Sequence, residues 1–213
     1  ITQIPFLMAK QTDGYMGGFR GRLGPAVGYL WNGKWCVRSH QPLVYNPRTE
    51  AQVAHRSMFK QQVQLAARMR WAVTTGLLDA SRQVGMTSYN LFVHLNQPAF
   101  GFEAGRLTVD YPSLQLSVGA AAPTGQAVWR LAEGNVLEVD FAAGDGGAVD
   151  HVYLYVYSEG LGRGVLSAPV YRRHGRVSLM LPDGAAADGL HAYLMVRRPD
   201  GQWSETVYVD RAD

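Results

Sequence analysis

Short alternating segments, divided by turn residues, run through the second half of the chain. After about residue 105, strand-like runs recur between turns such as Asp-Gly and Asp-Gly-Gly. Even spacing of this kind is typical of an antiparallel β-sandwich. The predicted strands are Leu107–Asp110, Ser113–Val118, Ala127–Leu131, Val136–Ala142, His151–Ser158, Val165–Arg172, Arg176–Leu181, Leu190–Arg197 and Ser204–Val209.

Alternation within one of these strands also assigns its two faces. Val152, Leu154 and Val156 share one side of the strand His151–Ser158, and we expect them to face the core. The tyrosines between them would then lie on the other face. A solvent-exposed row of tyrosines would favour an adhesin-like carbohydrate binder, and the residues concerned are Tyr153, Tyr155, Tyr157 and Tyr171.

The first 46 residues have a different residue pattern, because glycines interrupt aromatic and β-branched residues. This pattern indicates short, strongly bent strands. The clearest signal is Tyr29–Trp31, followed by Asn32-Gly33 and then Lys34–Arg38. Asn-Gly suits both central positions of a type I′ turn, so this segment predicts a β-hairpin.

The middle of the chain, about residues 47–98, predicts helices. Thr49–Gln52 is a capping box, and neither Gly nor Pro occurs from 48 to 75. We expect one long helix that ends near Gly76 or continues to Ala80, then a short helix over Ser88–Asn96 capped by Thr87. The predicted fold class is therefore α+β: a glycine-rich hairpin and a long helix in residues 1–104, followed by a sandwich in residues 105–213.

Charge is divided unequally between the halves of the chain. Residues 1–100 contain eleven Lys or Arg and three acids, whereas residues 101–213 contain nine Arg and fourteen acids. The total of +3 is thus the sum of +8 in residues 1–100, the basic front, and −5 in residues 101–213, the acidic back. Such a chain attracts an anionic partner at one end, or the acidic end of its own copy.

Motifs for catalysis, cofactors or metals are missing from the sequence. Gly28–Lys34 fits the start of a P-loop, but Trp35 replaces the Ser or Thr that holds magnesium, and a strand replaces the helix. None of the six histidines lies at metal-ligand spacing from a partner on one helix. With Cys36 alone, an intrachain disulfide is excluded. We expect no enzyme activity, cofactor or metal.

Several motifs in the segment Gly17–Asn96 resemble an uncharacterised protein family of Bacteroidota. They are Gly21-Arg-Leu-Gly24-Pro-Ala-Val-Gly28, Trp35-Cys-Val-Arg-Ser39, Asn46-Pro-Arg-Thr-Glu-Ala-Gln52 leading to Arg56 and Phe59, and Asn90-Leu-Phe92. The resemblance implies no catalytic residue, since the family has no assigned activity. Similar Asn-Pro-x-Thr-x-Ala-Gln helices in phage-encoded proteins favour a virion role. The β half is similar in strand number and length to immunoglobulin and fibronectin type III modules, which implies an Ig-like sandwich.

We expect a self-associating structural protein, a subunit of a filament, surface assembly or virion. Its basic front would contact the acidic back of another copy, and the apolar arm at residues 1–8 would add a strand to a neighbour's sheet. This hypothesis favours an extracellular, cell-surface or virion location over the cytoplasm, with no membrane span. The alternatives are nucleic-acid binding through the basic half and carbohydrate binding. The expected interface residues are Ile1, Ile4, Phe6, Leu7, Arg48, Arg56, Lys60, Arg68, Glu133, Asp145 and Asp188.

Overall fold

The computed structural model describes residues 9–11, 17–31, 33–43, 46–103 and 106–212. They belong to two compact units, residues 1–52 and residues 53–213. This division does not coincide with the one expected between residues 104 and 105, because the helices of the second unit share a core with its sandwich.

The first unit contains a four-stranded antiparallel sheet in which each strand pairs with the next. Its central pairing confirms the predicted hairpin, because Trp31 lies opposite Lys34 and Gly33 has a φ of 75°. The strands are β1 (Lys10–Gln11), β2 (Phe19–Leu23), β3 (Ala26–Trp31) and β4 (Lys34–Ser39).

The predicted long helix is three helices. They are α1 (Glu50–Arg68), α2 (Arg70–Gly76) and α3 (Leu78–Gln83). Hydrogen bonds continue across the junction at Met69, whose amide donates to Leu65 O at 2.8 Å. Met69 and Leu77 are both fully buried, so the junctions keep the apolar side chains directed at the core.

Both predicted helix starts are confirmed by their caps. The Gln52 amide donates to Thr49 Oγ1 at 3.4 Å at the start of α1. The Asn90 amide donates to Thr87 Oγ1 at 3.2 Å at the start of α4 (Ser88–Asn96). A 3₁₀ turn η1 (Gln97–Ala99), the hairpin of β5 (Phe100–Glu103) and β6 (Arg106–Val109), and a 3₁₀ turn η2 (Tyr111–Ser113) follow.

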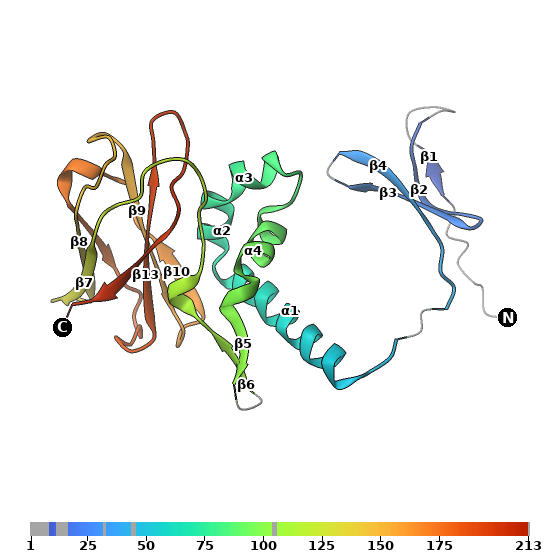
Figure 1. The fold of residues 1–213 in the computed structure, drawn as a ribbon, viewed down its shortest axis with the longest axis horizontal. Coiled ribbons are helices and arrows are strands. Elements are labelled where there is room, and N and C mark those ends of the chain that lie inside the picture. The colour runs from blue at the N-terminus through green and yellow to red at the C-terminus, as the bar shows by residue number, and fades with distance from the viewer. Residues whose placement is uncertain (1–8, 12–16, 32, 44–45, 104–105, 213) are drawn as a thin grey trace. The chain divides into compact units, whose positions relative to one another are not determined.

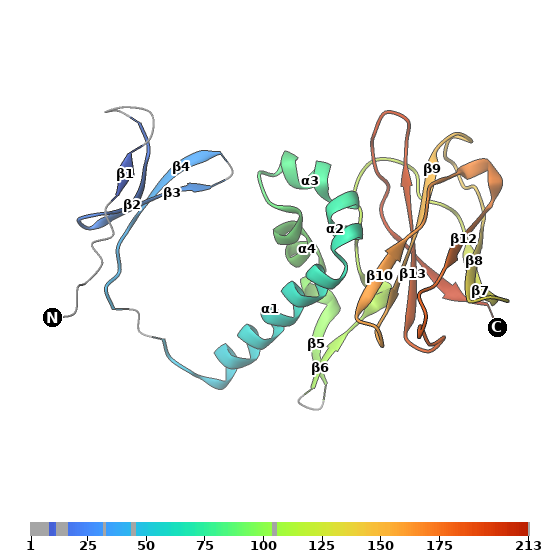
Figure 2. The same ribbon diagram turned by 180° about the vertical axis from the view of Figure 1, so that it is seen from behind.

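The sandwich has the predicted antiparallel, Ig-like architecture. One layer contains β7 (Ala127–Ala132), β8 (Val136–Phe141) and β12 (Arg176–Met180). The other contains β9 (His151–Ser158), β10 (Arg163–Leu166), β11 (Val170–Tyr171), β13 (Leu190–Arg197) and β14 (Val207–Arg211). A short parallel pairing of β14 with β7 joins the layers. The helices lie beside the second layer (Figures 1 and 2).

Two hydrophobic cores therefore share the strands β9 and β13. Leu154 and Val156 face the sandwich core, as predicted. Tyr155, Tyr157 and Tyr193 point to the other face, where they pack in a second core with residues of the helices such as Met69 and Phe92. The central strands are consequently buried on both faces, and a boundary at residues 104/105 would cut through a core.

Two predicted strands are absent or divided in the structure, and a third, Ser204–Val209, is shifted to β14 at Val207–Arg211. Ser113–Val118 is not a strand, because the amides of Leu116 and Ser117 donate to Thr206 Oγ1 at 2.8 and 2.7 Å instead of to a neighbouring strand. Val165–Arg172 divides into β10 and β11 around Pro169, which has no amide to donate.

Candidate interaction surfaces

The sheet of the first unit separates its side chains between two faces of different character. The register pairs Lys10 with Arg20, and Val27 with both Arg22 and Arg38. Directly opposed residues of antiparallel strands point to the same side of the sheet, and successive residues alternate. The register therefore assigns each strand residue to one of the two faces. One side, the basic face, carries Lys10, Arg20, Arg22, Val27, Tyr29, Trp31, Lys34, Cys36 and Arg38. The other, the apolar face, carries Phe19, Leu23, Ala26, Leu30, Trp35 and Val37, with Gln11 and Ser39 at its margin.

The described residues of the first unit leave the apolar face largely uncovered. Leu23 is 62% exposed and Val37 is 63% exposed. Among the described residues of this unit, Gly28 alone is buried. A small sheet needs a covered hydrophobic face for independent stability. The apolar face is therefore a surface that some other structure must cover.

Two glycines shape this face. A side chain at Gly18 would overlap the ring of Trp35, and one at Gly28 would overlap Phe19. Both rings thus lie close against backbone that has no Cβ, and the glycines are needed for this close approach. Sequence reasoning assigned the glycines to bends and missed the apolar face. The signal was present in the alternation of Leu30, Trp35 and Val37 with the charged and tyrosine positions beside them.

The basic residues expected at an interface are all exposed on or next to α1. These are Arg48, Arg56, Lys60 and Arg68. Apolar side chains are exposed on the same helix, since Val53, Phe59 and Val63 are each at least 41% accessible. Their contact with another copy stays a prediction. The other expected interface residues, Ile1, Ile4, Phe6 and Leu7, lie outside the described residues.

The acids expected to meet this helix do not form one patch. Glu133 lies in the turn between β7 and β8, and Asp188 lies in the loop before β13. Asn135 Nδ2 donates to Leu181 O at 3.1 Å, which places this turn and loop at one end of the sandwich. Asp145 follows β8 and so lies at the opposite end. Asp145 therefore lies among different elements from Glu133 and Asp188, and a neighbour would have to contact the two ends of the sandwich separately.

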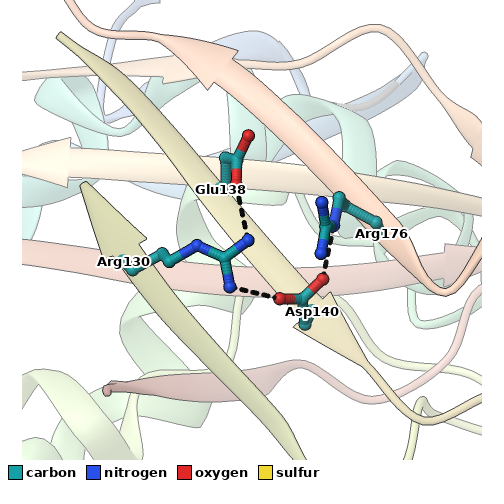
Figure 3. A network of polar contacts seen from close by, with 4 residues as sticks. All are labelled: Arg130, Glu138, Asp140 and Arg176. Atoms are coloured by element: carbon teal, nitrogen blue, oxygen red, sulfur yellow. Dashed lines mark hydrogen bonds and ion pairs between the residues drawn. The ribbon is translucent and has the colours of Figure 1, made fainter. Parts of the chain in front are cut away.

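Several other acids are already paired within the second unit. Arg130 donates to Asp140 Oδ2 and Glu138 Oε2, both at 2.8 Å, and Arg176 donates to Asp140 Oδ1 at 2.6 Å (Figure 3). The hydrogen bond from Arg176 lowers the pKa of Asp140, and the same bond raises the pKa of Arg176. These cross-strand pairs lie on the outer side of the β7–β8–β12 layer. Arg130, Glu138, Asp140 and Arg176 thus neutralise one another on this surface.

One acid is paired in the interior. Arg172 is fully buried, and its Nε lies 3.4 Å from Asp150 Oδ2. Its guanidinium also donates to the carbonyl oxygens of Pro123 at 3.1 Å, Ala143 at 2.6 Å and Ala122. This arginine ties three loop segments together, which is a structural role.

The tyrosine row predicted for carbohydrate binding is covered by the helices. Tyr155 and Tyr157 are 0% and 1% exposed. Burial strongly raises the pKa of Tyr155, with a smaller contribution from Tyr157. Tyr171 is exposed, but it lies on the short edge strand β11. The sandwich therefore lacks the exposed row of four tyrosines on which that hypothesis depended.

The most developed polar cluster of the second unit surrounds His191. Its Nε2 lies 2.9 Å from Glu159 Oε1 and its Nδ1 lies 3.2 Å from the Tyr208 hydroxyl. The ring of Tyr111 stacks on the imidazole with 3.8 Å between centroids. Burial raises the pKa of Tyr111, and the nearby Glu159 carboxylate adds to the effect. Both imidazole nitrogens are engaged and one ring face is covered, so the cluster attaches η2 to the sheet. These positions are far apart in the sequence, and no local pattern predicted their meeting.

A hollow of about 530 Å³ lies between α3 and the loop after β13. Its charged side chains are engaged locally, since Arg197 lies over the Trp203 ring and Asp200 pairs with Arg198 at 3.2 Å. In the part of the chain that the structure describes, no three His, Cys, Asp or Glu side chains gather as metal ligands. None of the described helices combines the length and apolarity that a membrane crossing requires.

Comparisons with known proteins place the chain in a family. The solution structure of the fn3 domain of human collagen alpha-1(XX) chain is similar at 19% identity, over 44% of this chain and 90% of that chain, with a TM-score of 0.33. The search of curated proteins found no match. The sequence profile described as "Family of unknown function (DUF6266)" matches residues 18–209. Because this match covers most of the sequence, the chain belongs to the family of unknown function DUF6266.

Proposed function

We propose that the chain is a non-catalytic assembly protein that self-associates through the apolar face of its N-terminal sheet. The observation that carries the proposal is that face: Phe19, Leu23, Leu30, Trp35 and Val37 line it, and the described residues of the unit form no core around them. Such a sheet gains stability when another apolar surface covers it.

A second copy is the occupant that this face fits best. The residues of β1–β4 on this face include no charged side chain, so these strands bring no like charges together when two copies pack face to face. Their basic faces would point outward, and stacked sheets of this kind form a sandwich about 10 Å thick. The contact would be isologous, as in most homodimers.

The expected affinity is modest. Covering the remaining exposed surface of five large apolar side chains on each copy is worth roughly 10 kcal/mol, and association costs ~4–15 kcal/mol. The surplus is at most about 6 kcal/mol, which predicts concentration-dependent association with a Kd of tens of micromolar.

A second contact would extend dimers into a polymer. The exposed cations Arg56, Lys60 and Arg68 of one copy are complementary to Glu133 and Asp188 at one end of another copy. This contact joins unlike surfaces, and such heterologous contacts propagate. A polymer of this kind suits a filament, a surface assembly or a virion, outside the cytoplasm.

Cysteine cross-linking tests the first contact. Cys36 is the only cysteine and lies on the basic face, whereas the adjacent Val37 lies on the apolar face. In the double variant Cys36→Ser, Val37→Cys, a bismaleimide whose reach matches the ~10 Å between stacked sheets should link two copies efficiently. The wild-type chain, with its cysteine on the outward face, is the matched control and should link poorly.

A pair of charged substitutions provides an independent readout. Leu30→Lys on the apolar face should shift the chain to monomer in sedimentation experiments, and Tyr29→Lys on the basic face should not. A wild-type chain that stays monomeric up to ~100 μM, with equal cross-linking at positions 36 and 37, would contradict the proposal.

A further inference from the structure

The five Lys and Arg residues in β1–β4 all lie on one side of the sheet. They are Lys10, Arg20, Arg22, Lys34 and Arg38. No acidic residue occurs in these four strands. The alternation therefore places cations on the basic face and nowhere else in the sheet.

This arrangement is costly for the sheet alone. Lys10 lies directly opposite Arg20, and like charges in that relation destabilise a sheet. Arg22 and Arg38 flank Val27 on the two neighbouring strands. Strands are about 4.8 Å apart, so the five charges lie within about one or two Debye lengths of one another at physiological salt. An anion bound across the strands would relieve this repulsion.

Aromatic side chains are interleaved with these cations. Tyr29 and Trp31 lie on the same face and are 38% and 50% exposed. Trp31 lies directly opposite Lys34. Rings and cations on one accessible surface are the features that hold single strands, because the bases stack while the phosphates pair with Lys and Arg.

The acidic half of a second copy suits this face less well. Its acids are distributed over both ends of the sandwich, and many already pair with arginines of their own unit, such as Glu138, Asp140 and Asp150. An acidic protein would also offer Tyr29 and Trp31 no bases on which to stack. We infer that the basic face binds single-stranded nucleic acid through Lys10, Arg20, Arg22, Lys34 and Arg38, with Tyr29 and Trp31 stacking on bases.

The binding does not depend on the proposed self-association, because the two surfaces are opposite sides of one sheet. The test uses the full chain, a fluorescent single-stranded oligothymidine and a range of salt concentrations. Five neutralised phosphates predict a slope of about −3.5 in log affinity against log salt, which is a loss of about 100-fold from 50 to 200 mM.

Variants locate the site. Lys34→Ala with Arg38→Ala should weaken binding and reduce the slope by about 1.4, since two phosphate contacts are lost. Arg82→Ala with Arg173→Ala removes equal charge from exposed positions of the second unit and should change neither quantity. Trp31→Leu should weaken binding about 5- to 150-fold, and Trp31→Phe should retain it.

Three results would overturn the inference. The first is absence of binding at 50 mM salt. The second is loss of binding in the Arg82, Arg173 control and not in the Lys34, Arg38 variant. The third is binding to polyglutamate as tight as to oligothymidine and unaffected by Trp31→Leu, which would identify an acidic protein as the partner. Polyglutamate binding that survives in Trp31→Leu while oligothymidine binding falls shows that the variant is folded and supports stacking.

Discussion

Arg172 shows how one buried side chain organises loops of the sandwich. Its guanidinium reaches the Asp150 carboxylate and three carbonyl oxygens from segments that precede it by 22 to 50 residues. No side chain fits at Gly146, because it would overlap this guanidinium. A buried charge is tolerated here since its partners are present from several directions.

We expect Arg172→Met to destabilise the second unit by about 3–5 kcal/mol, because it removes the cation that lies beside the buried Asp150 carboxylate. Urea unfolding followed by circular dichroism measures the change. Arg176→Met removes an exposed partner of Asp140 and is the control, with the urea midpoint nearly unchanged. Equal effects of the two substitutions would show that burial of Arg172 is not the cause.

The buried tyrosines predict a response to alkaline pH. Burial raises the pKa of Tyr111, Tyr155 and Tyr193, so the folded chain keeps their protons when the unfolded chain loses them, above about pH 10. The stability they contribute is complete below that pH and falls as pH rises through the raised values. Tyrosinate absorbance should therefore show a subset of the eleven tyrosines that ionises only on unfolding. A single transition near pH 10 for all tyrosines, in a chain that stays folded, would contradict this.

Among the elements, α2 ends against the segment that follows η2. A Cβ at Gly76 would overlap the carbonyl oxygen of Leu116. Helix propensity by itself makes alanine better than glycine by about 1 kcal/mol, but a clash with fixed backbone reverses the sign. The contact with the Leu116 segment therefore determines which residue fits at the end of α2.

Gly76→Ala should destabilise the second unit by about 1–3 kcal/mol, as measured by thermal or urea unfolding. Gly160→Ala is the control, because a Cβ there meets nothing within 4 Å, and its stability should stay close to wild type. A gain in stability for Gly76→Ala would mean that the Leu116 segment moves away without cost.

At the scale of the whole molecule, the helices and the sandwich form one folding unit. Tyr155, Tyr157, Tyr193 and Met195 project from β9 and β13 into the core that the helices close. Removal of the helices would expose a contiguous apolar face, which promotes aggregation.

Two truncations test this unit. A fragment of residues 47–213 keeps the Thr49 cap and the whole helical core, and we expect it to be folded and monodisperse. A fragment of residues 105–213 should aggregate and bind a hydrophobic dye. The idea fails if the shorter fragment is monomeric and as stable as the longer one.

Local pattern determined much of this protein from the sequence alone. The Asn-Gly hairpin, the caps at Thr49 and Thr87, and the strands β9 and β13 were predicted with their observed positions, because each depends on interactions between near neighbours or on strict alternation. The same alternation places the basic and the apolar residues of the first sheet on opposite faces.

Tertiary structure decided what covers each face. Alternation shows that Tyr155 and Tyr157 lie opposite Leu154, but it does not show whether water or a helix lies beyond them. Distant partners likewise decided that Thr206 and Asn96, instead of a strand, bind residues 115–117, and that His191 meets Glu159 and Tyr111. Burial and side-chain pairing depend on contacts between residues far apart in the chain, so they follow from the fold and not from a local sequence pattern.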